Sequence, residues 1–417
     1  YTFKVTANDV ADSPLARGLI GQTVTIDLLL SGTRADGETW VGSPLFASSG
    51  KGYLEEIPES INELLSRGGS FTVAKGNGIA NFSDFIQEPG SLIDVSGGFI
   101  QFAGTTVDTT RLLGSDGQVY DIGSADPTIS YSSIAGQFTV DHAHWGITEY
   151  YSTPLSRRSY YQPGYIDGVS AGSVSVSAVN PILEGDIVGS IVTGLKQAML
   201  AQAPTGSGGA QTTFDQLPSG AALTINLETP NLAVGDDEIV LANAAPEALP
   251  ADFNFLTTPY LNLAGASGEP LPTDSYGVPV ITYSTSALSA EGLGSITIKG
   301  AAFLSMAPGA GLSVLPGGSV TLNDATTIDG TIIARGGTIA LAGFTPTATL
   351  GNGAAPVAYE NLVLGPDAVL NVSGLWVNDA LASTSPFQGK AYTNGGSVSL
   401  TTYALSQVNG TTELYKN

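Results

Sequence analysis

Residues 88–98 read Glu-Pro-Gly-Ser-Leu-Ile-Asp-Val-Ser-Gly-Gly, a turn followed by a short run that alternates apolar and polar side chains. Two other stretches repeat this arrangement: 307–318, Ala-Pro-Gly-Ala-Gly-Leu-Ser-Val-Leu-Pro-Gly-Gly, and 365–375, Gly-Pro-Asp-Ala-Val-Leu-Asn-Val-Ser-Gly-Leu. In every copy an apolar residue stands four positions after the proline, and a small polar residue and a valine follow it. A turn and strand used again and again indicates a repeat architecture.

A second repeated element is a pair of glycines before an alternating strand, as in Gly317-Gly318-Ser319-Val320 and Gly336-Gly337-Thr338-Ile339. Gly294, Gly318 and Gly337 stand 24 and 19 residues apart, and one turn of a parallel β-helix takes about 20–25 residues. Apolar residues would point into such a coil, with serine and threonine pointing out. We therefore predict an all-β chain: a parallel β-helix (solenoid) with inserted loops or small subdomains and one or two short helices.

The composition agrees with that class and excludes several others. The 417 residues include 53 glycines and 23 prolines, with only 12% charged side chains, which is typical of strands separated by frequent turns. The absence of cysteine excludes disulfides and thiolate chemistry. No apolar run is long enough to span a membrane, and we predict no membrane insertion. A net charge of −23 argues against binding nucleic acid.

The rhythm of the repeats predicts a division of the chain. The repeats indicate shaft over roughly 68–104, 168–193 and 291–417, and we expect the chain to be an internal piece of a longer protein. The first expected segment is β-helix over 1–104 with a short helix near 52–67, followed by a tyrosine-rich insertion over 105–167. The next are β-helix over 168–242 with a loop insertion at 194–220, and a Pro/Ala-rich excursion over 243–290. The last is shaft over 291–417, which we expect to continue beyond residue 417.

The tyrosine-rich insertion holds seven of the chain's 16 tyrosines and one tryptophan. Tyrosine and tryptophan give large contact area at low entropic cost, which makes the insertion the candidate contact surface. Its candidate residues are Tyr120, Tyr131, Trp145, Tyr150, Tyr151, Tyr160, Tyr161 and Tyr165. The alternative is that the insertion packs on the shaft or caps it, since buried aromatic clusters are common. The sequence leaves both open.

The only two histidines, His142 and His144, lie two residues apart beside Asp141. On a strand they would share a face and could bind a metal ion. No third nitrogen ligand exists, so a surface or packing pair is favoured. We predict no metal site and no cofactor.

Some parallel β-helices hydrolyse or cleave polysaccharides, which needs carboxylates gathered on one face. Asp94, Asp329 and Asp367 occupy turn positions, where such side chains satisfy backbone groups. The cluster at 236–238 is best interpreted as a solvated turn. We predict no catalytic residues.

The chain resembles the large filamentous-haemagglutinin-like exoproteins of Gram-negative bacteria. The most distinctive stretches are 109–127, beginning Thr-Thr-Arg-Leu-Leu, and 135–149, Ala-Gly-Gln-Phe-Thr-Val-Asp-His-Ala-His-Trp-Gly-Ile-Thr-Glu, with a further match at 374–379. The resemblance implies a right-handed β-helical rod, two-partner secretion through an outer-membrane transporter, and a place outside the cell or on the outer surface of a Gram-negative bacterium.

Three functions remain at this stage. The first is an adhesin or structural surface filament that contacts a host or neighbouring cell. The second is an extracellular fibre or coat component that associates with other copies of itself through open coil ends and flat Ser/Thr faces. The third, which the sequence favours least, is a polysaccharide-processing enzyme.

Overall fold

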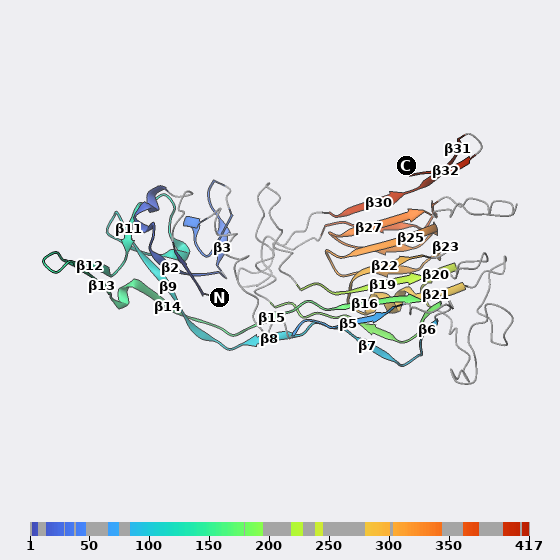
Figure 1. Cartoon of the computed structure of the whole chain (residues 1–417), viewed down its shortest axis with the longest axis horizontal. Coiled ribbons are helices and arrows are strands. Elements are labelled where there is room, and N and C mark those ends of the chain that lie inside the picture. The colour runs from blue at the N-terminus through green and yellow to red at the C-terminus, as the bar shows by residue number, and fades with distance from the viewer. Residues whose placement is uncertain are drawn as a thin grey trace.

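The computed structural model describes residues 2–6, 14–28, 30–36, 39–46, 66–74, 84–178, 180–194, 218–227, 238–244, 280–300, 303–343, 362–374, 395–408 and 411–416. Strands dominate and helix is scarce, which confirms the all-β class. Figure 1 shows two parts: a stack of parallel strands on the right and an antiparallel module on the left. The antiparallel pair β8 (Phe99–Phe102) and β15 (Tyr165–Gly168) runs between them.

The parallel-strand stack contains three rows of strands. The first row is β5 (Ser70–Val73), β16 (Ser173–Ala178), β19 (Ala221–Leu227), β22 (Leu293–Lys299), β25 (Ser319–Ile328), β27 (Thr338–Gly343) and β30 (Ser397–Thr401). The second consists of the pair β6 (Asp84–Gln87) and β17 (Asn180–Leu183) and of a hydrogen-bonded run of β21 (Val280–Ser284), β20 (Glu238–Ala242), β23 (Phe303–Met306), the end of β25 and β28 (Val363–Leu364). The third consists of the pair β7 (Leu92–Asp94) and β18 (Asp186–Val188) and of a separate three-stranded sheet of β24 (Gly311–Ser313), β26 (Thr331–Ile333) and β29 (Val369–Asn371).

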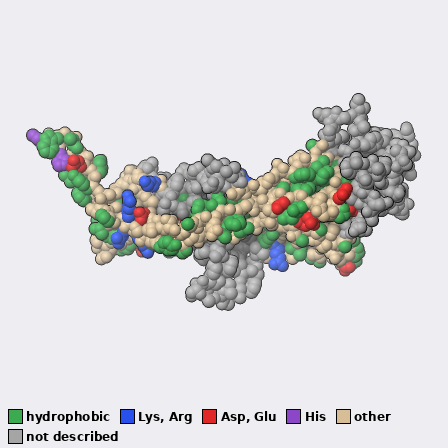
Figure 2. Space-filling model, turned by 90° about the horizontal axis from the view of Figure 1, so that it is seen from below, with side chains coloured by type: hydrophobic (Ala, Val, Ile, Leu, Met, Phe, Trp, Pro, Cys, Tyr) green, Lys and Arg blue, Asp and Glu red, His purple; other side chains and the backbone are tan. Residues whose placement is uncertain are grey.

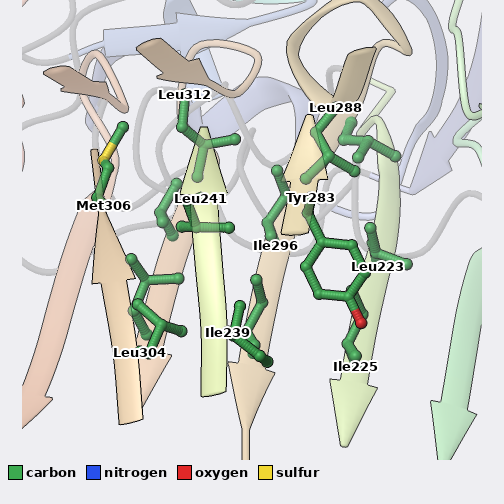
Figure 3. Close-up of a cluster of buried hydrophobic side chains, with 14 of the residues drawn as sticks. Leu223, Ile225, Ile239, Leu241, Tyr283, Leu288, Ile296, Leu304, Met306 and Leu312 are labelled. Carbon is green, nitrogen blue, oxygen red and sulfur yellow. The ribbon is translucent and has the colours of Figure 1, made fainter. Parts of the chain in front are cut away.

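The first row is in register from strand to strand. Ser319 pairs with Thr338, and Thr338 with Ser397, so the serine or threonine after each glycine pair forms one line along the stack. The alternate residues face inward, and Val320 and Ile339 are fully buried, as the alternation predicted. Figure 3 shows how the inward side chains of several strands meet in one core. Each such buried side chain contributes roughly 1.5–3 kcal/mol.

At five of six aligned glycines of the first row, the backbone of the neighbouring strand leaves no room for a side chain. We call Gly69, Gly172, Gly294, Gly318, Gly337 and Gly396 the glycine column. A Cβ placed on Gly337 would lie 1.9 Å from the carbonyl oxygen of Gly318. The same oxygen accepts a hydrogen bond from the Thr338 N–H at 3.0 Å, so the ladder itself holds the two backbones too close for a side chain.

The corner between the first and second rows lies inside β25. Residues up to Leu322 pair with β22, and residues from Ala325 pair with β23. Asp324 between them has a φ of 59°, the one positive value among the described non-glycine residues. Asparagine and aspartate tolerate this conformation better than other side chains, which allows one strand to serve two rows.

One part of the stack was not foreseen from the sequence. Within the predicted excursion over 243–290, β21 lies beside β20 in the second row, and the helix α4 (Thr285–Ala290) follows it directly. The Ser284 hydroxyl caps α4 by accepting from the Ala287 N–H, and the Ser289 hydroxyl donates to the Gly311 carbonyl of β24. The end of the excursion therefore belongs to the stack.

The antiparallel module has its own core. Its elements are β1 (Thr2–Thr6), η1 (Pro14–Leu19), β2 (Thr23–Asp27), β3 (Ser31–Thr33), β4 (Thr39–Val41), η2 (Pro44–Phe46), β9 (Thr105–Gly114), β10 (Val119–Asp121), η3 (Ile122–Ser124), β11 (Tyr131–Ile134), β12 (Gln137–His142), β13 (Ile147–Ser152), η4 (Pro154–Ser156) and β14 (Arg157–Gln162). Leu19, Ile26 and Leu45 pack in one buried cluster with Leu112 and Tyr131. Residues 14–45, which the sequence analysis placed in the first β-helix segment, thus join the tyrosine-rich insertion.

Some predicted features lie outside the described residues. These are the helix near 52–67 except its last two residues, residues 195–217 of the loop insertion, and residues 245–279 of the excursion. Near the C-terminal end of the described chain, β31 (Tyr403–Val408) and β32 (Thr411–Lys416) form an antiparallel pair.

The glycine column gives a test with a matched control. Gly337→Ala should lower the free energy of unfolding by at least about 2 kcal/mol, because its Cβ meets the backbone of the neighbouring strand. Gly69→Ala, at the same position in the outermost described strand, should change it by less than about 1 kcal/mol, because no described atom lies within 4 Å of its Cβ. Urea unfolding measures both, and equal losses would contradict the role of the column.

Candidate contact surface

Four of the eight predicted contact residues have structural roles. Tyr131 is only 1% exposed and lies in the core of the module, so it does not belong to any contact surface. Its hydroxyl donates to the Asp126 carbonyl at 3.0 Å. Burial, with the nearby Asp126 carboxylate adding to it, raises the pKa of Tyr131 to about 12. Tyr120 packs edge-on against Tyr131 with ring centres 5.6 Å apart.

Tyr160 and Tyr165 are likewise held by neighbours. The Tyr160 hydroxyl donates to the buried Asp27 carboxylate of β2. Burial and this hydrogen bond raise the pKa of Tyr160. Tyr165 stacks on Phe102 with ring centres 5.0 Å apart, across the β8–β15 pair. These four residues therefore pack within the module or the β8–β15 pair, and none of these contacts is made with the parallel-strand stack.

The other four predicted residues are exposed. Trp145 is 71% exposed, Tyr150 81%, Tyr151 43% and Tyr161 68%. Three of them lie on the hairpin formed by β12 and β13, whereas Tyr161 lies on β14. The structure therefore gathers Trp145, Tyr150 and Tyr151 and leaves Tyr161 apart from them.

The β12–β13 hairpin projects from the module into solvent. Figure 1 shows it at the far left of the molecule, and Figure 2 shows the two histidines, coloured purple, at its outer end. Its strands pair from Gln137 with Ser152 to His142 with Ile147. The described residues include no third strand paired to this ribbon.

One face of the hairpin is predominantly apolar, and the His142–Glu149 pair lies on the same face. Side chains alternate across a two-stranded ribbon, so Phe138, Tyr151 and Ile147 share a face. Phe138 and Tyr151 stack with ring centres 5.2 Å apart, and both Phe138 and Ile147 are more than half exposed. Neither was among the predicted contact residues, although the alternating runs on either side of Gly146 carry the hairpin signal.

The turn of the hairpin brings the histidines beside the tryptophan. The His142 and Trp145 rings lie 5.6 Å apart, and His142 Nε2 is 3.1 Å from the Glu149 carboxylate. Hydrogen bonds from Tyr151 and His142 lower the pKa of Glu149. Among the described residues no three histidine, cysteine or acidic side chains are grouped as metal ligands would be.

A polar groove begins at the base of the hairpin. Its volume is about 660 Å³, and it lies between the β1–β2 pair and the β9–β14 pair. Threonine hydroxyls form much of its lining, together with the charged residues Lys4, Asp108 and Arg157. The Arg157 guanidinium lies 4.0 Å from Asp108 and is largely exposed. No local sequence pattern marks this groove, because its walls come from segments some 80 residues apart.

The carboxylates weighed as catalytic candidates serve turns. Asp94 Oδ1 accepts from the Ser96 N–H at 2.9 Å, and Asn371 Oδ1 accepts from the Ser373 N–H at 3.0 Å, so two copies of the repeated turn make the same contact. The Ser96 hydrogen bonds lower the pKa of Asp94. Asp329 Oδ1 accepts from the Asp367 N–H at 2.8 Å. Of the 236–238 cluster only Glu238 is described, in β20.

Comparison with known proteins identifies no relative: no family model, no curated protein and no solved structure matches the chain. In the part of the chain that the structure describes, none of the helices has the length and hydropathy of a membrane span.

The buried Tyr131 hydroxyl predicts how stability responds to alkali. A pKa raised above that of the unfolded chain means stability that is present below about pH 10 and is lost as pH rises toward 12. Tyr131→Phe should cost about 1 kcal/mol at pH 7 through the lost hydrogen bond, and a smaller amount at pH 11. Urea unfolding at the two pH values measures this, with the exposed Tyr150→Phe as control. An equal cost at both pH values would contradict it.

Proposed function

We propose that this chain is a segment of a secreted or surface-displayed right-handed parallel β-helical rod that acts as an adhesin or structural surface filament without catalysis. The observation that carries the proposal is the set of three parallel rows around one apolar core. Successive strands of the first row come from successive turns of the chain, which is how a solenoid extends in one direction. Such a rod would hold a contact surface at a distance from the cell that displays it.

The proposed contact surface is the hairpin at the far end of the module. It combines exposed aromatic side chains with a position that nothing else in the described chain covers. Exposed apolar groups that lie together on a projecting element are typical of interaction sites. Trp145, Tyr150 and Tyr151 supply the aromatic area that contact surfaces use.

The absence of catalysis in this proposal rests on what the acids do. Asp94, Asp329 and Asp367 are engaged by backbone N–H groups or lie in the turns that they stabilise. A polysaccharide-processing enzyme needs two carboxylates that converge on one bond. The groove of the module contains a single acid, Asp108, beside two cations, which does not fit that chemistry.

Self-assembly into a fibre or coat is the second candidate. In the last first-row strand, the inward residues Val398 and Leu400 are 40% and 47% exposed, whereas their counterparts in β27 are buried. Further strands, of this chain or of a second copy, would bury these two side chains. Export through an outer-membrane transporter, and a place on the Gram-negative cell surface, form part of the proposal through the family resemblance alone.

Replacing only the hairpin tests the adhesive role. Gln137 and Ser152 are paired, so residues 138–151 can be replaced by Asn-Gly, a favoured two-residue turn, with the core around Tyr131 left intact. Binding of chain-coated beads to host cells and to cells of the producing bacterium should fall at least about tenfold, as expected when hot-spot aromatics are removed.

A matched control removes exposed apolar groups elsewhere. Leu92→Ser with Phe99→Ser changes two similarly exposed side chains of β7 and β8 and should leave bead binding unchanged. Binding that is equally strong with and without the hairpin would remove the hairpin as the contact surface.

A further inference from the structure

The hairpin and the groove are complementary features of one module. The hairpin presents an apolar face and a tryptophan to solvent, and the groove combines apolar walls with threonine hydroxyls, Lys4 and the Arg157–Asp108 pair. We propose that two copies of the chain pair by reciprocal exchange: the tip of each β12–β13 hairpin docks in the groove of the other copy. Pairing covers the hairpin that the proposed function presents to a cell, so the two uses compete for the same residues.

The relative position of the two features fits such an exchange. Gln137 and Ser156, at the base of the hairpin, line one end of the groove, and Phe102 and Tyr165 line the other. From the base, the hairpin runs outward while β9 and β14 run the opposite way toward β8 and β15 (Figure 1). A twofold axis near Gln137 therefore carries each hairpin over the groove of the second copy, which gives a closed, isologous dimer.

The charges of the two features are opposite. The hairpin carries Asp141 and Glu149, and the sequence contains no lysine or arginine from residue 112 to residue 156. The groove has Lys4 and Arg157 against one acid, Asp108. In a chain with a net charge of −23, two copies repel each other over most of their surface. A local meeting of opposite charges selects this face over others.

The chemistry of the tip suits the groove. The groove's 660 Å³ falls in the range of cavities that hold a group of ring-sized substituents, and the tip offers the indole of Trp145 with two imidazoles. The indole N–H and the imidazoles can bond to the threonine hydroxyls and Asp108, while the exposed Arg157 guanidinium can lie over an aromatic face. Two hairpins are covered per dimer, so the isologous arrangement buries twice the area that one docked hairpin buries.

The molecular mass in solution tests the pairing. Sedimentation equilibrium should give twice the chain mass of 42.4 kDa at micromolar concentration. Trp145→Ala should raise the dimer dissociation constant at least about 30-fold, as removal of a central aromatic anchor does. Trp145 contacts only the two histidines among the ring contacts of the described residues, so an unchanged circular dichroism spectrum would show that the fold survives. Leu92→Ala, a similarly exposed site on the stack, should leave the dimer intact.

Charge reversal tests the groove specifically. Asp141→Lys in the hairpin and Lys4→Glu in the groove should each weaken the dimer by about tenfold or more, and the double variant should recover most of the loss because opposite charges meet again. Since the chain has no cysteine, Ala143→Cys with Thr106→Cys should give a disulfide-linked dimer under oxidising conditions. Ala143→Cys with Ser397→Cys, placed on the stack, should not.

Several results would overturn the proposal. These are a monomer at all concentrations up to about 100 μM, a dimer that the Trp145→Ala variant leaves unchanged, a hairpin-dependent dimer that ignores Lys4→Glu, or open-ended polymers. Bead adhesion measured on the same variants distinguishes this proposal from the adhesive function. Loss of adhesion with an unchanged mass contradicts the dimer, and loss of the dimer with unchanged adhesion contradicts the adhesive role of the hairpin.

Discussion

The close approach of backbones at the glycine column is the constraint on which the parallel-strand stack depends. Each carbonyl there accepts an N–H from the next strand, as Gly318 does from Thr338 at 3.0 Å. The same carbonyl leaves no room for a side chain on the column glycine of the next strand, as at Gly337. Where the column position holds Ala221, the pairing with β22 shifts register at that residue. The register resumes at Ala222, which pairs with Ser295, so the row keeps the register that places its apolar side chains inside.

A stack fixed in this way accepts additions only at its corners and ends. The part of the antiparallel module that follows β8 is inserted between β7 and β16, and the chain returns to the stack through β15. β7 and β16 still belong to adjacent levels of the stack. The module has a separate apolar cluster and needs no contribution from the stack's core. Chemical variety is thus free to enter the module while the rows keep their serine, glycine and valine pattern.

The sequence predicted the rows well and the module poorly, for one physical reason. Alternation reports that a strand buries one face but not which strand pairs with it, so Val24 and Ile26 could not be told from stack residues. The glycine pairs were detected from the sequence, yet within the pairs only Gly317 and Gly336 have a positive φ. The glycines that follow them, Gly318 and Gly337, are needed because the backbone of the neighbouring strand lies too close for a side chain. Likewise, the aromatic count could not separate buried Tyr131 from exposed Tyr150, because burial is decided by residues 14–45, distant in sequence. Gly146 between two alternating runs was the one local signal of the hairpin.

The β12–β13 hairpin has few contacts of its own to stabilise it. A lone two-stranded ribbon is marginally stable in water, and this one is joined to the module only at its base. Its internal contacts, the Phe138–Tyr151 stack and the His142 contacts to Trp145 and Glu149, hold its shape without burying the apolar face. Any surface that covers this face removes apolar area from water and orders the ribbon at once. The net gain from covering it is therefore smaller than the contact area alone implies, because ordering the ribbon offsets part of the free energy of contact.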